Sequence, residues 1–285
     1  MNRIELTDVA QNLFDPSVVT QGQQHVTPFH KYVALRLALE GGFRPENITP
    51  STKLISKQET NQRARLGSTD EQDQITEATV LGKYRTKAID VVVTDTEAGP
   101  VLGVSVKTTG KAFRNLTNRV EELVGDAANV HGWYPGFVYG FLHIIKKIRR
   151  SDVESDNDAS FSDDGTPLDS IWRLHDVLAS LNGRDDVAGP ADIYESTCLL
   201  VLEETESGIV IDSDFPPRGS PIRFETFFEQ MYEVYDHRYC YLPARTHHCR
   251  NFWKPYVQAP KAIEEIDLNG ELDQSGHPYT ARLAE

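Results

Sequence analysis

Residues 88–107, AIDVVVTDTEAGPVLGVSVK, contain two runs rich in β-branched residues. The first run, residues 88–94, predicts a strand, and residues 101–108 predict a second strand. Gly99-Pro100 separates the two runs and is typical of a turn. The stretch therefore predicts a β-hairpin.

The segments around the hairpin predict an α/β protein. Residues 113–130 carry an apolar stripe at helical spacing, and residues 137–145 are apolar throughout, which is typical of a strand buried on both faces. The other predicted elements are helices over 28–40, 168–181 and 224–235, and strands over 195–202 and 208–211. We expect a central mixed β-sheet flanked by helices.

Length and composition exclude several classes of protein. The 285 residues are 39% apolar, enough for one large core. The longest apolar run is residues 137–145, whereas a membrane span needs about 20 residues. Residues 1–8 contain two acids and no apolar segment, so we expect no signal peptide. Three cysteines are too few for a disulfide framework, and we expect a cytoplasmic protein without a membrane partner.

The net charge of −14 is unevenly distributed. Residues 1–150 carry 19 Lys and Arg against 16 Asp and Glu, whereas residues 151–285 carry 10 against 27. A surface that binds nucleic acid must be locally positive, so such a surface is expected in the first half. We expect residues 1–150 to hold the catalytic core with its N-terminal helix. Residues 151–285 then supply an acidic loop and α/β elements that complete or extend the same domain.

Polar residues within the hairpin are the candidates for chemistry. Ser105 and Lys107 share one face of their strand because side chains alternate along a strand. Asp90 interrupts an apolar strand, where a carboxylate is costly unless it is paired, hydrogen-bonded or bound to metal. On the helix that follows, Glu121 falls beside the apolar stripe. These groups suit metal-dependent phosphodiester hydrolysis, because Mg²⁺ takes carboxylate and carbonyl oxygens and a lysine can orient the attacking water.

The pattern Asp90, then Ser105-Val106-Lys107, resembles the PD-(D/E)XK nuclease superfamily. That family has an Asp on one strand and an acidic residue two positions before a Lys on the next. Here Ala88-Ile89 replaces the Pro-Asp entry, and Ser105 replaces the acidic residue. A subgroup of type II restriction endonucleases has Ser-Val-Lys at this place and takes its second carboxylate from the following helix.

The resemblance implies a restriction-endonuclease-like fold and a set of roles. Asp90 and Glu121 would bind one or two Mg²⁺ ions together with the Val106 carbonyl. Lys107 would attend the nucleophilic water, and Ser105 would hold a vestigial or supporting position. The partners implied are double-stranded DNA, a second copy in a homodimer, and a cognate methyltransferase.

Several assignments remain open at this stage. Glu122 competes with Glu121 as the second metal ligand, and it shares a helix face with Asp126 four residues later. A third carboxylate would come from Glu40 or Glu77. The cations expected to contact DNA are Lys111, Arg114, Arg119 and Lys87, within larger clusters that also contain Lys83 and Arg85.

Three alternatives compete with the nuclease hypothesis. Asp90 and Lys107 can form a structural ion pair, with Glu121 and Glu122 on a solvated helix face. The chain can also be a nuclease-fold protein that binds DNA without catalysis. Finally, His237, Cys240, His247 and Cys249 have the residue types of a Zn²⁺ site, but the paired Cys-x-x-Cys spacing is absent and a surface loop is favoured.

Overall fold

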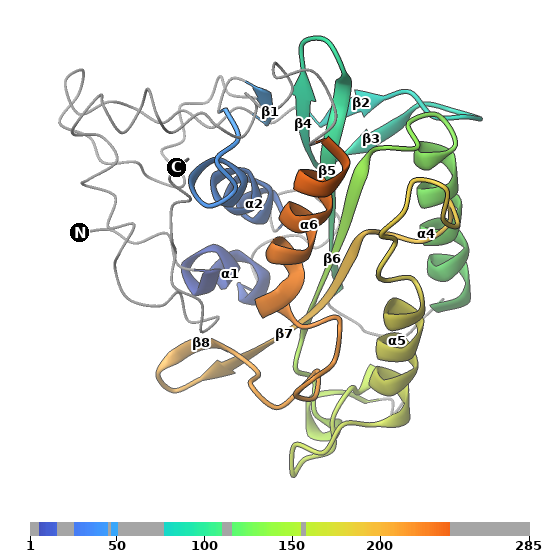
Figure 1. Ribbon diagram of the computed structural model, residues 1–285. Coiled ribbons are helices and arrows are strands. Elements are labelled where there is room, and N and C mark those ends of the chain that lie inside the picture. Colours follow the sequence, from blue (N-terminus) through green and yellow to red (C-terminus); the bar gives the residue numbers. More distant parts are fainter. Residues whose placement is uncertain are drawn as a thin grey trace, which may run out of the picture. The chain divides into compact units, whose positions relative to one another are not determined.

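The computed structural model describes residues 6–15, 26–44, 47–50, 77–109, 116–154 and 158–239 (Figure 1). The chain divides into two compact units. The first comprises residues 1–79, 88–104 and 235–285, and the second comprises residues 80–87 and 105–234. The second unit therefore contains residues on both sides of position 150.

The described elements include both helices and strands, as predicted for an α/β protein. The helices are α1 (Leu6–Phe14), α2 (Thr27–Leu39), α4 (Leu116–His131), the 3-10 helix η3 (Arg150–Asp152), α5 (Asp169–Ser180) and α6 (Phe224–Tyr239). The strands are β1 (Ile48–Thr49), β2 (Ala78–Val80), β3 (Lys87–Ile89), β4 (Val91–Asp95), β5 (Gly99–Thr109), β6 (Val138–Lys146), β7 (Ser196–Thr205) and β8 (Gly208–Ile211).

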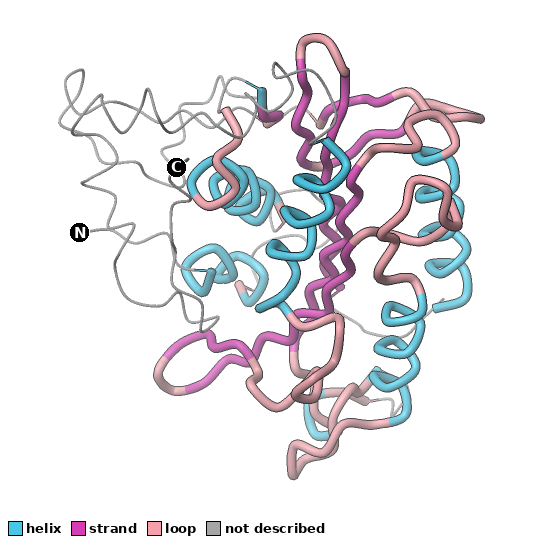
Figure 2. The backbone as a smooth tube through the Cα atoms, viewed as in Figure 1, coloured by secondary structure: helices cyan, strands magenta, loops and turns pink. Residues whose placement is uncertain are grey.

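The strands form one mixed six-stranded sheet and one small sheet. The six-stranded order is β1-β4-β5-β6-β7-β8, and β2 pairs with β3 separately. Figure 2 shows the strands of the large sheet with helices beside them. The predicted mixed sheet flanked by helices is confirmed at this level of description.

The first unit contains β4 and the part of β5 up to Val104, whereas the rest of β5 belongs to the second unit. β4 and β5 are antiparallel, with Val91 opposite Val104 and Val93 opposite Leu102. One prediction was wrong in detail, because the strand expected over 88–94 is interrupted at Asp90. Residues up to Ile89 belong to β3, which pairs with β2, and the chain bends at Asp90 before entering the large sheet as β4.

The second unit is built on two parallel central strands. Residues 138–145 of β6 are all buried, as the absence of polar alternation predicted, and β6 pairs in parallel with β7 from Gly140 opposite Ser196 onward. Helices α4 and α5 lie along one side of these strands (Figure 1). On Gly140, a Cβ would lie 2.4 Å from the Met231 sulfur of α6, so this glycine permits close packing of helix on strand.

A buried ion cluster joins the elements of the second unit. The Glu195 carboxylate is fully buried and accepts hydrogen bonds from Arg184 Nη1 at 2.7 Å and from the Tyr139 backbone N–H at 2.6 Å. The imidazole of His131 lies 3.1 Å from the same carboxylate. These contacts fix the carboxyl end of α4 and the start of β6 and β7, which are the elements that carry the pocket described next.

Candidate functional site

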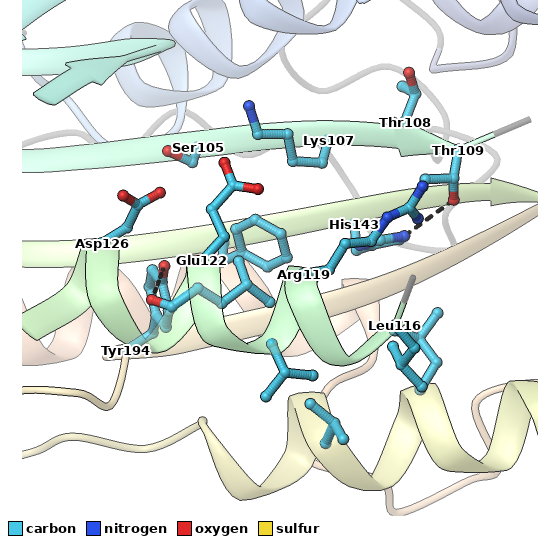
Figure 3. Close-up of a pocket in the computed structure, with 15 residues that line it drawn as sticks. Ser105, Lys107, Thr108, Thr109, Leu116, Arg119, Glu122, Asp126, His143 and Tyr194 are labelled. Atoms are coloured by element: carbon cyan, nitrogen blue, oxygen red, sulfur yellow. Dashed lines mark hydrogen bonds between the residues drawn. The ribbon is translucent and has the colours of Figure 1, made fainter. Parts of the chain in front are cut away.

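A pocket lies in the second unit between β5, β6, α4 and α5, with about 730 Å³ of empty space including its open mouth (Figure 3). Apolar side chains from the helices and from β6 form much of its wall. Its lining residues are Ser105, Lys107, Thr108, Thr109, Leu116, Arg119, Val120, Glu122, Leu123, Asp126, Phe141, His143, Leu174, Val177 and Tyr194.

Two of the predicted catalytic residues reach this pocket from β5. Ser105 and Lys107 both line it, as alternation along the strand predicted. Ser105 is buried, and its hydroxyl is hydrogen-bonded to the Tyr139 hydroxyl at 2.9 Å. Lys107 is exposed and lines the pocket. It forms no ion pair with any described residue of the second unit. Its ammonium group is therefore available to a ligand.

The carboxylates of the pocket come from successive turns of α4. Glu122 and Asp126 both line the pocket, and Figure 3 shows their carboxylates directed toward β5. Asp126 is buried and ion-paired with Lys87, and its other oxygen lies 3.4 Å from Arg85 Nη2. Glu122 has no ion pair or hydrogen bond in the described part of its unit. Glu121 is exposed and is not among the lining residues.

The pocket has a second basic side chain, Arg119, and a histidine, His143. Arg119 lines it one turn before Glu122, and burial lowers the Arg119 pKa while the negative charge of Glu122 opposes that shift. Thr109 Oγ1 lies 3.1 Å from His143 Nε2 in a buried hydrogen bond. Burial, aided by the positive charge of Arg119, lowers the pKa of His143 to about 3. His143 is therefore a neutral, hydrogen-bonded core residue.

Asp90 belongs to the first unit, at the bend between β3 and β4. Its side chain is buried, and its Oδ1 lies 3.3 Å from His30 Nε2 on α2. The sequence leaves Glu40 and Glu77 as candidates for a third carboxylate. Of these, Glu40 forms an ion pair with Arg36 of α2. Lys107 belongs to the second unit. That Asp90 acts together with Lys107 therefore stays a prediction from the sequence.

The pocket offers carboxylate and hydroxyl oxygens, which are ligand types that Mg²⁺ takes in proteins. Among the described residues, no group of three or more His, Cys, Asp or Glu side chains is positioned to hold a metal ion. Mg²⁺ does not require such a group, because it keeps several waters and is bound through one or two carboxylates and substrate phosphates. Glu122 supplies a carboxylate that lies within electrostatic range of Arg119 and forms no ion pair with a described residue of its unit, whereas Asp126 is ion-paired with Lys87.

Other predicted site residues have different outcomes. Lys87, expected on DNA, forms the ion pair with Asp126, and its side chain is 15% exposed. Val106 is buried within β5. Lys111 and Arg114 lie outside the described residues, as do Cys240, His247 and Cys249 of the zinc hypothesis, while His237 lies in the last turn of α6.

Sequence reasoning missed the contacts made by two histidines. His30 lies against Asp90, and His131 lies against Glu195. The helical and strand periodicities carry no signal for these pairs because their members are far apart along the chain. Only the tertiary packing brings them together.

Comparison with known proteins assigns no family, because no family model, curated protein or solved structure matches the chain. In the described ranges, every helix is too short or too polar to cross a membrane. Function must therefore be argued from the site itself.

Proposed function

We propose that this chain is a Mg²⁺-dependent endonuclease that hydrolyses phosphodiester bonds in double-stranded DNA. The observation that carries the proposal is the shared pocket of Lys107, Glu122 and Ser105, which come from the strand and helix that the motif names. A cation and a carboxylate beside a cluster of further basic and hydroxyl side chains suit a phosphodiester. Mg²⁺, when bound, supplies a Lewis acid for the phosphate and lowers the pKa of the attacking water.

Each residue then has a definite task. Glu122 contributes a metal-binding carboxylate in the second unit, and Asp90 contributes another on the evidence of the sequence. The exposed ammonium of Lys107 orients the attacking water and stabilises charge that develops on the phosphate. Arg119, which lines the pocket from α4, binds a phosphate oxygen. The hydrogen bond from Ser105 to Tyr139 holds β5 against β6 and leaves Ser105 a supporting position.

Within this proposal, a type II restriction endonuclease is the class that the Ser-Val-Lys pattern favours. Such an enzyme would act as a homodimer on a two-fold symmetric site, because a symmetric protein matches a palindrome. A cognate methyltransferase would protect the host sequence.

A second candidate function is a DNA-binding protein of the same fold without catalysis. Two observations favour it. Ser105 stands where the wider family has an acid, and Asp126 is already neutralised by Lys87. Cleavage of a panel of plasmids with Mg²⁺, with Ca²⁺ and with EDTA separates the two. The proposal predicts discrete fragments with Mg²⁺ only. Intact plasmid in all three, from folded protein that binds DNA, would support the second candidate.

A further inference from the structure

A short loop with unusual exposure joins β2 to β3. In this loop, residues 81–86, the ring of Tyr84 is 76% exposed and Leu81 is 50% exposed. Gly132, which follows α4, lies against the Lys83 side chain of this loop, and the next residue, Trp133, is 54% exposed. Exposed large apolar side chains that gather in one place indicate an interaction surface. This loop lies in the second unit, as α4 does.

The loop is held rigidly by a single side chain of α4. The Asn129 carboxamide accepts the backbone N–H of Tyr84 at 2.8 Å and that of Arg85 at 3.2 Å, and it donates to the Arg85 carbonyl at 2.8 Å. The backbone carbonyl of Asn129 also accepts a hydrogen bond from the Lys83 N–H at 2.8 Å. A Cβ on Gly82 would lie 2.1 Å from the Asn129 amide nitrogen, so this approach requires glycine. The exposed side chains are thus presented on a preorganised backbone.

The charges of the loop indicate what kind of partner fits. Lys83 and Arg85 flank Tyr84 in the sequence, and the Lys83 ammonium lies 5.2 Å from the centre of the Tyr84 ring. The Arg85 side chain is 68% exposed, so its contact with Asp126 at 3.4 Å is largely screened by solvent. These exposed cations stand on a chain whose net charge is −14. The phosphates of a nucleic acid neutralise such cations and release bound counterions, so the charge of the loop is complementary to DNA.

We propose that the 81–86 loop is a DNA-contact surface, in which Lys83 and Arg85 bind phosphates and Tyr84 packs against the sugar or base between them. This inference rests on the proposed function, since it takes DNA as the substrate. It adds a docking element outside the pocket that positions the duplex without reading its sequence. Asn129 and Gly82 serve this surface by fixing the loop.

Fluorescence anisotropy of a labelled duplex in EDTA tests the proposal, because cleavage cannot then affect the readout. The double substitution Lys83→Ala/Arg85→Ala is compared with Arg173→Ala/Arg218→Ala, which removes two exposed cations elsewhere in the second unit. We expect the loop variant to bind about tenfold more weakly and to lower the slope of log affinity against log salt by about two. The control should stay close to wild type.

Two further variants separate the aromatic and the backbone contributions. Tyr84→Ala should weaken binding about fivefold or more without changing the salt slope, because a stacked or packed ring carries no charge. Asn129→Ala, checked for folding by circular dichroism, should weaken binding although every cation of the loop remains.

Distinct outcomes would contradict the two proposals. Equal affinity and salt slope in the loop variant and the control would overturn the loop assignment, while the nuclease proposal would stand on its own cleavage test. Failure of wild-type protein to bind any duplex at low salt would overturn the proposed function and the loop assignment together.

Discussion

His30 and Asp90 lie against each other inside the first unit, with 3.3 Å between His30 Nε2 and Asp90 Oδ1. Both side chains are buried, one on α2 and the other at the bend between two strands. The contact with His30 holds the Asp90 carboxylate in place. Carboxylates that bind metal are commonly held this way, and their supporting partners affect metal affinity.

The first prediction concerns this pair. His30→Leu should weaken the apparent affinity for Mg²⁺ in DNA cleavage by about 10- to 100-fold, and His30→Gln should restore much of it because an amide N–H can replace the imidazole. Calorimetric titration with Mn²⁺ provides a readout independent of cleavage and should show the same order. His175→Gln, in the second unit, is the control. Unchanged metal affinity in folded His30→Leu would contradict a positioning role for His30.

Stability should depend on pH through His143. In the unfolded chain its pKa is near 6.5, and in the folded chain burial lowers it to about 3. The unfolded state therefore binds more protons between these two values, and stability falls as the pH falls through this window. Between pH 7 and pH 5 this residue alone should reduce the free energy of unfolding by about 2 kcal/mol.

Urea unfolding of the wild type and of His143→Gln at both pH values measures this effect. The variant keeps a hydrogen-bond partner for Thr109 and loses the titrating group, so its stability should change less with pH. An equal pH dependence in the two proteins would show that His143 is not the group responsible.

The buried cluster around Glu195 makes a third prediction. Arg184→Ala would leave a fully buried carboxylate without its guanidinium partner, and such a loss costs about 3–5 kcal/mol. Arg173→Ala, at an exposed position, should change stability by less than about 0.5 kcal/mol. Denaturant unfolding of both variants provides the comparison. A similarly small change in Arg184→Ala would mean that His131 and the Tyr139 N–H suffice for Glu195.

Local patterns predicted much of this protein, and the reason is physical. Alternation along one strand placed Ser105 and Lys107 together, and the four-residue spacing of a helix did the same for Glu122 and Asp126. Both periodicities are properties of a single element. The break at Asp90 was not visible because an apolar run reads the same whether it pairs within one sheet or is divided between two.

Contacts between distant segments escaped prediction for a related reason. His131 and Glu195 are 64 positions apart, and their contact depends on how α4 is joined to β7 in space. Likewise, the choice between Glu121 and Glu122 depends on the rotation of α4 about its axis. The apolar stripe defines that rotation only coarsely, and the pocket lining favours Glu122.

The central claim is that Lys107 and Glu122 form one hydrolytic site, and single-turnover cleavage of plasmid DNA with Mg²⁺ tests it most directly. Lys107→Ala and Glu122→Gln should each reduce the cleavage rate by about 100-fold or more. Glu121→Gln, one position away on α4 and outside the pocket lining, is the matched control and should cleave close to the wild-type rate. Folded Lys107→Ala and Glu122→Gln proteins that cleave as fast as wild type would contradict the account.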